Sequence, residues 1–400
     1  MAETADYLIV GGGIIGLNLA LVAKTRNPES SVVLIEKEPS CGFHASGRNS
    51  GVLHAGFYYT SDSLKARFTR DGCKRLTDYC LQRGLQIKQN GKLVVARNEG
   101  ELRDLDELFL RGEKNGVQLE KISANDARKI EPRARTYERA LYSPSTAAVD
   151  PSEVVRSFLS DAIELGVQVR TDTEYIGRDG SDIRTSRGLI SAGYVINAAG
   201  VYADAIARDF GFAKDYRILP FKGLYLYQDA DAPPVRTAIY PVPNLEQPFL
   251  GVHLTVTVGG RVKLGPTATP AFWKEHYRGM ANFRLAEMSE VVSREALFFL
   301  RDDFAFRRLA IRELQKYSRS HMVRTAGELA EGLKLEHFSQ WGRPGIRAQL
   351  VNITKNKLVM DFCYEADENS FHVLNSVSPA FTCALPFTEH IFDQIEISAG

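Results

Sequence analysis

The stretch DYLIVGGGIIGLNLALVAKTRNPESSVVLIEKE, residues 6–38, decides the fold of this chain. A short apolar run at 7–10 precedes three glycines, a helical pattern at 14–24 follows them, and a second apolar run occupies 32–35. Continuous apolar runs of this length are typical of parallel strands that are covered on both faces. The order therefore predicts a strand, a tight turn, a helix and a second parallel strand.

The glycines of this segment have the spacing of a dinucleotide-binding turn. Gly11, Gly13 and Gly16 fit G-x-G-x-x-G, which permits a tight turn, close approach to a pyrophosphate and close helix–strand packing, in that order. The helix then begins at Ile14, where free N–H groups favour an anion by about 0.3–1 kcal/mol. Glu36 follows the second strand, at a position where a carboxylate hydrogen-bonds a ribose diol. We predict dinucleotide binding; a βαβ unit that binds nothing is the alternative.

Composition bounds the class of protein. The 400 residues exceed one simple core, so we expect two structural units. A net charge of +1 gives no overall field that favours nucleic acid. The five cysteines lack C-x-x-C spacing, which indicates reduced thiols, and we predict no metal site. No apolar run approaches the roughly 18 residues needed to span a bilayer, so we expect a cytoplasmic protein.

Nucleotide-binding features recur along the chain, with other structure inserted between them. A second helix–strand unit starts at Asp150-Pro151, whereas short strands broken by Pro and Gly occupy 219–265 and predict an antiparallel sheet. We expect a discontinuous cofactor domain, residues 1–85, 146–212 and 340–400, and a substrate domain, residues 86–145 and 213–339. Simple nicotinamide dehydrogenases usually complete the nucleotide domain in one block, so the interleaving favours a flavin.

Eight motifs carry a resemblance to a known family, and they cover nearly the whole chain: GGGIIG, ASGRNSGVLHAGFYY, LKAR, NAAG, YPVPN…PFLGVHLT, GPTA, GIRAQ and NSVSPAFT. Together they resemble the FAD-dependent oxidoreductases of the D-amino-acid oxidase superfamily, and within it the L-2-hydroxyglutarate oxidase/dehydrogenase group. The resemblance implies an α/β fold: a Rossmann-like FAD-binding domain of the glutathione-reductase/D-amino-acid-oxidase type with an inserted α+β substrate domain on an antiparallel sheet. One departure is PFKGLYLY (220–227), where the group typically reads Phe-Arg-Gly, an acid and Tyr.

The resemblance implies that non-covalent FAD lies extended across the cofactor domain. Its AMP half would rest on the first βαβ unit, with a loop near the ribityl chain, a backbone contact to adenine and a turn beside the AMP. The last helix would direct its positive end at the flavin pyrimidine ring, which favours the anionic reduced flavin. The implied residues, in that order, are Gly11, Gly13, Ile14, Gly16, Glu36 and Lys37; Ser46, Arg48, Asn49, Ser50 and Gly51; Val169; Gly200; and Ser378, Pro379 and Ala380.

Oxidation of a hydroxy acid requires a carboxylate clamp and a base. Arg347 in GIRAQ fits the superfamily's clamp, because a guanidinium pairs a carboxylate through two hydrogen bonds; a structural salt bridge is the alternative. His54 and His253 are the candidate bases, since histidine titrates near neutral pH. Each could instead be a core histidine, and His54 could attach the flavin covalently. Tyr59 is a candidate for the pocket wall and Lys222 for a second carboxylate.

The expected function is oxidation of an L-2-hydroxy acid, 2-hydroxyglutarate-like, to the 2-oxo acid by hydride transfer to flavin N5. An amine or amino-acid oxidase of the glycine or sarcosine type, and a flavin-binding protein without turnover, are the alternatives. We expect oxygen or a quinone as electron acceptor. The segment RDDFAFRRLAIRELQKYSRSHMVR (301–324) is basic and amphipathic, so it suits peripheral contact with the inner face of an anionic membrane; a solvated helix packed on the substrate domain is the alternative.

Overall fold

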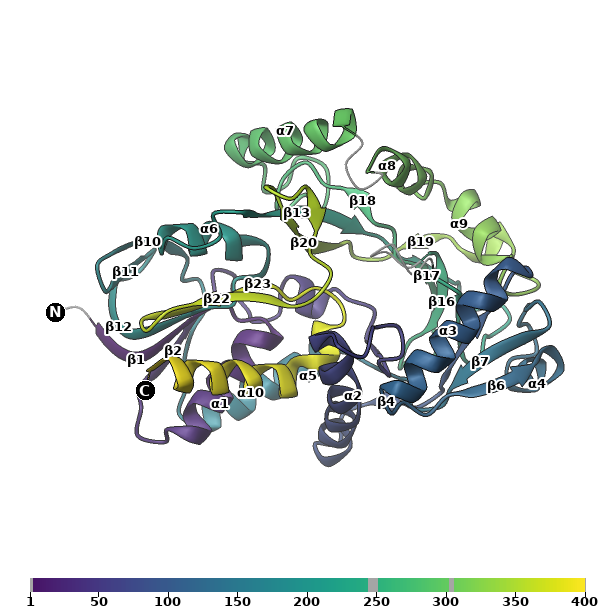
Figure 1. Cartoon of the computed structure of the whole chain (residues 1–400), viewed down its shortest axis with the longest axis horizontal. Helices are drawn as coiled ribbons and strands as arrows, with labels where there is room; N and C mark the ends of the chain where they lie inside the picture. The colour runs from purple at the N-terminus through teal and green to yellow at the C-terminus, as the bar shows by residue number, and fades with distance from the viewer. Residues whose placement is uncertain (1–2, 244–250, 302–305, 400) are drawn as a thin grey trace. The chain divides into compact units, whose positions relative to one another are not determined.

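The computed structural model describes residues 3–243, 251–301 and 306–399, without the side chains of Leu309 and Ala399. The chain divides into two compact units, whose elements are labelled in Figure 1. Unit 1 consists of Met1–Asn49, Pro151–Pro220 and Ile346–Gly400. Unit 2 consists of Ser50–Asp150 and Phe221–Gly345. The chain passes between the units four times, and two of these passages lie within strands, β13 (Tyr216–Gly223) and β20 (Gly345–Asn352).

Unit 1 is built on a parallel sheet with antiparallel additions. Five strands pair in parallel in the order β9-β2-β1-β12-β23: Gln168–Arg170, Val32–Ile35, Glu3–Val10, Gly188–Asn197 and Ser370–Asn375. The antiparallel strands are β10 (Tyr175–Asp179), β11 (Asp182–Thr185) and β22 (Cys363–Ala366). Strand β21 (Lys357–Leu358) pairs with β20. All four residues of β2 are buried, as the apolar run predicted.

Four helices belong to the part of unit 1 that the structure describes, and among them α1 and α6 contact the sheet. They are α1 (Ile14–Arg26), α5 (Pro151–Glu164), α6 (Ala203–Asp209) and α10 (Ala380–Ala399), with short 3-10 turns η1 (Ala45–Gly47) and η2 (Gly200–Tyr202). The last helix lies alongside the first, yellow beside purple in Figure 1, and α5 also contacts α1. Helix α5 begins at Pro151, the position the sequence predicts, because proline suits the first turn of a helix.

Unit 2 is built on a second large sheet. Its strand order is β19-β14-β17-β16-β15-β5-β7-β6: Gln340–Trp341, Leu226–Tyr227, Val262–Gly265, His253–Val256, Ala238–Pro241, Lys92–Val95, Arg139–Ser143 and Glu120–Ser123. Every described pair is antiparallel except β15 with β5, which is parallel. The predicted antiparallel sheet is therefore present. Its one parallel pair among the described strands joins β15, which follows β13 in the chain, to β5, which precedes α5.

The remaining elements of unit 2 surround this sheet. A small sheet pairs β3 (Val52–Leu53), β8 (Ala147–Val149) and β4 (Ile87–Lys88), and β18 (Thr269–Pro270) pairs with β13. The helices are α2 (Leu64–Gln82), α3 (Gly100–Lys114), α4 (Ala124–Ile130), α7 (Leu285–Arg301), α8 (Phe306–Gln315) and α9 (Arg319–Ala326), with the 3-10 turn η4 (Leu335–His337).

The unit boundary near residue 85 differs from the one expected from the sequence. Residues 50–85 lie in unit 2, not with the first βαβ unit, and 146–150 lie with them. The reason is strand pairing, since Val52 pairs with Ala148 and α2 packs against β3 and β4. A two-residue strand has no periodicity that would reveal such a pairing from sequence.

Candidate functional site

The glycine turn of unit 1 has the geometry its spacing predicts. Gly11 has φ +112°, a conformation that favours glycine, and a Cβ there would lie 2.5 Å from the carbonyl oxygen of Ala198. A Cβ at Gly16 would lie 1.9 Å from the carbonyl oxygen of Gly11, so only glycine allows α1 to pack this closely. Helix α1 starts at Ile14, directly after the turn. Its first N–H groups therefore follow a turn free of side chains at the positions where a pyrophosphate needs close approach.

Glu36 directly follows β2, and its side chain hydrogen-bonds to the glycine turn. Its carboxylate accepts hydrogen bonds from the Gly12 N–H (2.8 Å) and the Glu38 N–H (2.9 Å). Its neighbour Lys37 pairs with Glu38 at 2.6 Å and lies over the ring of Tyr202. A carboxylate at this strand end fits the acceptor that the hydroxyl groups of a ribose diol require.

The loop after β2 returns to the start of α1. The Ser46 hydroxyl accepts a hydrogen bond from the Ile14 N–H at 2.9 Å, so this loop reaches the helix N-terminus. Arg48 donates to the Phe43 carbonyl at 2.7 Å, and the Asn49 amide donates to the Ser46 carbonyl at 2.8 Å. These bonds give the loop a defined conformation beside the glycine turn.

Two of the predicted cofactor residues belong to unit 2. Gly51 has φ +71° and its carbonyl accepts from the Val149 N–H at 2.8 Å, whereas the Ser50 side chain bonds to Tyr225. The remaining ones lie in unit 1. Val169 pairs with Leu34, Gly200 has φ +57° with open space where a Cβ would stand, and Ser378-Pro379 immediately precede α10, which starts at Ala380.

The large sheet of unit 2 has one apolar face, and its other face combines polar side chains with a second apolar cluster that includes Val94 and Leu141. Alternate residues of its central strands, among them Leu93, Ile239 and Leu254, join an apolar cluster with residues of α4 and α9. The residues between them must point to the opposite face, because side chains alternate along a strand. Five buried side chains with polar groups lie on that side, and we call them the polar face: Lys92, Tyr240, His253, Thr255 and Lys263.

His253 on the polar face is held as a neutral base. Its Nδ1 lies 2.8 Å from the Gly251 carbonyl oxygen, which can only accept, so Nδ1 carries the proton and Nε2 has the free lone pair. Burial lowers the pKa of His253 to about 3; the bond to Gly251 opposes this shift, and the charges of Lys92 and Lys263 contribute to it. The imidazole therefore stays unprotonated at neutral pH.

His54 belongs to the same electrostatic cluster. It follows β3, is 8% exposed, and burial lowers its pKa to about 3, with further contributions from Lys92 and then from His253. The structure thus brings together the two histidines that the sequence singled out separately. Tyr59 lies five residues after His54: its carbonyl accepts from the Asn115 amide at 3.0 Å, and its ring faces the Lys65 ammonium.

Sequence reasoning missed Lys92, Tyr240 and Lys263. The signal was available, because KLVV (92–95) and VKLG (262–265) each place one lysine in an otherwise apolar strand. Charged residues are rarely fully buried without a reason.

The two candidate carboxylate ligands lie in different units. Lys222 on β13 in unit 2 is 6% exposed, burial lowers its pKa, and its carbonyl accepts from the Thr267 hydroxyl at 2.9 Å. Arg347 on β20 in unit 1 directs Nε (3.3 Å) and a terminal nitrogen (3.2 Å) at the side-chain oxygen of Gln349. That contact occupies the edge of the guanidinium that Nε and one terminal nitrogen form.

The glycine turn, the acid after β2 and the interleaved parallel sheet define a dinucleotide-binding α/β protein. More particularly, the chain belongs to the FAD dependent oxidoreductase family, whose model matches residues 6–384. The predicted family, fold class and cofactor are confirmed: the protein is an FAD-dependent oxidoreductase that acts on a small molecule. Among the described residues, no helix combines the length and apolar character needed to cross a membrane.

Similar proteins share nearly the full length of the chain. The mitochondrial L-2-hydroxyglutarate dehydrogenase of Homo sapiens is 34% identical over 98% of this chain and 88% of its own. The L-2-hydroxyglutarate dehydrogenase of Escherichia coli (strain K12) is 31% identical over 98% and 93%. In fold, the chain resembles the L-alpha-glycerophosphate oxidase of Mycoplasma pneumoniae with FAD bound, at TM-score 0.78, 22% identity and coverage of 98% and 95%. Glycine oxidase from Geobacillus kaustophilus gives TM-score 0.76 at 17% identity, with coverage of 99% and 96%.

Proposed function

We propose that this protein oxidises an L-2-hydroxy acid of the 2-hydroxyglutarate type to the 2-oxo acid. The observation that carries the proposal is the state of His253: buried, neutral, and with Nε2 available as a proton acceptor. The names of the relatives at 31–34% identity support the substrate class.

The reaction removes a proton from the substrate hydroxyl and a hydride from C2. FAD, held by the glycine turn and the start of α1, would supply the acceptor for that hydride. His253 accepts the hydroxyl proton at Nε2, so that the alcohol becomes a carbonyl as the hydride leaves. General base catalysis of this kind typically contributes 10²–10⁴-fold. His54, also buried and within electrostatic reach of His253, is the alternative base and otherwise a substrate contact.

Arg347 is the proposed clamp for the carboxylate next to C2, since its guanidinium can offer two parallel donors. Tyr59 is proposed to line the pocket, and Lys222 remains the candidate that the sequence suggests for a second carboxylate. The proposed FAD contacts are the sixteen cofactor-binding positions named above, from Gly11 to Ala380. Among them, Glu36 would hold the ribose and the start of α1 the pyrophosphate.

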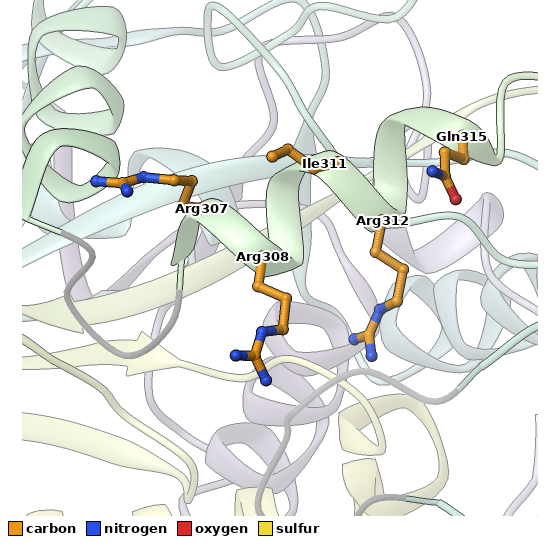
Figure 2. Close-up of a pocket in the computed structure, with 5 residues that line it drawn as sticks. All are labelled: Arg307, Arg308, Ile311, Arg312 and Gln315. Carbon is orange, nitrogen blue, oxygen red and sulfur yellow. The ribbon is translucent and has the colours of Figure 1, made fainter.

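The proposed electron acceptor is oxygen or a quinone, and a membrane quinone would be reached by peripheral contact through α8. Ile311 and Leu314 are 50% and 53% exposed, and Ile311 lines a surface hollow together with Arg307, Arg308 and Arg312. Figure 2 shows Arg308 and Arg312 extending from the same side of the helix, at a surface hollow that Ile311 and Gln315 also line. Apolar side chains beside arginines suit an anionic lipid surface, at about 1 kcal/mol per cation.

The alternative for this segment, a helix packed on its own unit, is supported by other residues of α8. Phe306 and Ala310 are buried, so part of the apolar stripe faces inward. The proposed membrane contact therefore rests on the exposed side chains of α8 alone, Arg307, Arg308, Ile311, Arg312 and Leu314. Phe304, which the sequence pattern also includes, lies outside the described residues, as does the side chain of Leu309.

A substrate panel tests the function. Flavin bleaching under anaerobic conditions is measured with L-2-hydroxyglutarate, other L-2-hydroxy acids, glycine and sarcosine. We expect bleaching by hydroxy acids. Bleaching by glycine or sarcosine alone would identify an amine or amino-acid oxidase instead, and a flavin that no substrate bleaches would indicate a binding protein without turnover.

A further inference from the structure

Lys92 is a fully buried lysine enclosed by aromatic rings. It is the first residue of β5 and is 0% exposed. Its Nζ lies 4.7 Å from the ring centroid of Phe57, 4.6 Å from that of Tyr58 and 4.9 Å from that of Tyr240. Within the described part of the chain, this nitrogen has no hydrogen-bond partner.

This arrangement leaves the ammonium incompletely satisfied. Aromatic faces attract a cation, by about 2 kcal/mol when it is desolvated. They do not replace the acceptors that an ammonium with three N–H donors requires, and burial of an unpaired charge costs several kcal/mol. Burial accordingly lowers the pKa of Lys92 to about 7. A thiolate at Cys73 would favour the charged form of Lys92, but burial raises the pKa of that thiol to about 11 and so keeps it neutral. A bound anion would supply both the acceptors and the opposite charge.

The position of Lys92 connects such an anion with the candidate base. Lys92 and His253 project from the same polar face, with Tyr240 in contact with both: its ring stacks on His253 and also faces the ammonium. The charge of Lys92 acts on both His253 and His54. An anion at Lys92 would therefore lie on the same face of the sheet as the proton acceptor, with Tyr240 in contact with both side chains.

We propose that Lys92 binds the second carboxylate of a dicarboxylic 2-hydroxy acid and thereby sets a preference for dicarboxylic over monocarboxylic substrates. This inference rests on the proposed function. Lys222 is the competing candidate for the second carboxylate. Its charge contributes to the lowered pKa of His276, whereas the lysine whose charge lowers the pKa of both His253 and His54 is Lys92.

The test compares two substrates that differ only at the far end. L-2-hydroxyglutarate and L-2-hydroxyvalerate have the same chain length, with a carboxylate in one and a methyl group in the other. We expect Lys92→Met to lower kcat/KM for hydroxyglutarate by roughly 10- to 100-fold, the worth of a charge-assisted hydrogen bond. The loss for hydroxyvalerate should be at least tenfold smaller. Lys74→Met, at an exposed lysine of α2, is the matched control.

The outcomes separate the candidates. An equal loss on both substrates would overturn the inference, since Lys92 would then act on the histidines or on packing. A selective loss in Lys222→Met with none in Lys92→Met would assign the second carboxylate to Lys222.

A binding measurement covers the case of an unstable or inactive enzyme. Glutarate should raise the Tm of the unmodified holoenzyme more than butyrate does, because only glutarate carries two carboxylates. Lys92→Gln should remove that difference while retaining the flavin absorption spectrum. If glutarate and butyrate raise the Tm of the unmodified holoenzyme equally, the inference about Lys92 is overturned, whether or not a hydroxy acid is turned over. If no hydroxy acid is turned over, the proposed function is overturned.

Discussion

The imidazole of His253 stacks on the ring of Tyr240, with 3.8 Å between centroids and 21° between planes. The stack and the bond from Nδ1 to Gly251 fix both the plane and the tautomer of the imidazole. A base held in this way needs no reorientation before it accepts a proton, and preorganisation of this kind lowers the barrier of the chemical step.

The first prediction concerns the base. His253→Gln should lower kcat by roughly 10²–10⁴-fold, because glutamine cannot accept a proton at neutral pH. The same change at His54 should cost less if His54 only contacts substrate. Rapid anaerobic flavin reduction measures the step, with His321→Gln on α9 as control. A larger loss in the His54 variant would exchange the two roles.

The second prediction concerns acid stability. Both histidines have a folded pKa lowered from 6.5 to about 3. As the pH falls below 6.5, the unfolded chain takes up protons that the folded chain does not, so the free energy of unfolding falls until about pH 3. Each histidine contributes a slope of about 1.4 kcal/mol per pH unit. Urea unfolding between pH 7 and 4 measures this slope.

The same experiment on variants supplies its check. His253→Gln removes one of the two groups, so the slope should decrease. An unchanged slope would show that the imidazole of His253 is protonated in the folded protein over this range.

The third prediction concerns the carboxylate clamp. Arg347→Lys should raise KM for a hydroxy acid strongly, because an ammonium lacks the two-donor edge of a guanidinium. Steady-state kinetics with a dye acceptor measures the change, and Arg343→Lys, an exposed neighbour, is the control. If KM is unchanged, Arg347 does not bind the carboxylate.

The fourth prediction concerns the cofactor. Glu36→Ala should weaken FAD retention by about 1.5–3 kcal/mol, the value of a charge-assisted hydrogen bond. Loss of the two backbone N–H bonds to Glu36 adds to this by loosening the turn. Flavin fluorescence on dilution measures the dissociation constant, and Glu29→Ala at an exposed site is the control. Acid precipitation should release the flavin; colour in the pellet would indicate a covalent bond.

The fifth prediction concerns α8. Arg308→Glu with Arg312→Glu should abolish co-sedimentation with anionic liposomes at low salt, because both cations project from one side of the helix (Figure 2). The same charge change on α3, Arg103→Glu with Lys114→Glu, is the control. No liposome binding by the unmodified protein, with full turnover on oxygen, would favour an oxidase that needs no membrane.

The sequence by itself determined the nucleotide-binding unit. The turn at Gly11, the acid at Glu36 and the helix that starts at Pro151 are local features, because each follows from backbone conformation within a few residues. The motifs also determined the family. Such features survive without knowledge of distant contacts.

Only the tertiary structure decided the polar face and the extent of unit 2. Lys92, Tyr240 and His253 come from three strands, and their proximity depends on the parallel pairing of β5 with β15 and the antiparallel pairing of β15 with β16. Residues 50–85 join unit 2 through the short pairing of β3 with β8. Strand pairing between distant segments is set by burial on both faces of the finished sheet, which no local pattern encodes.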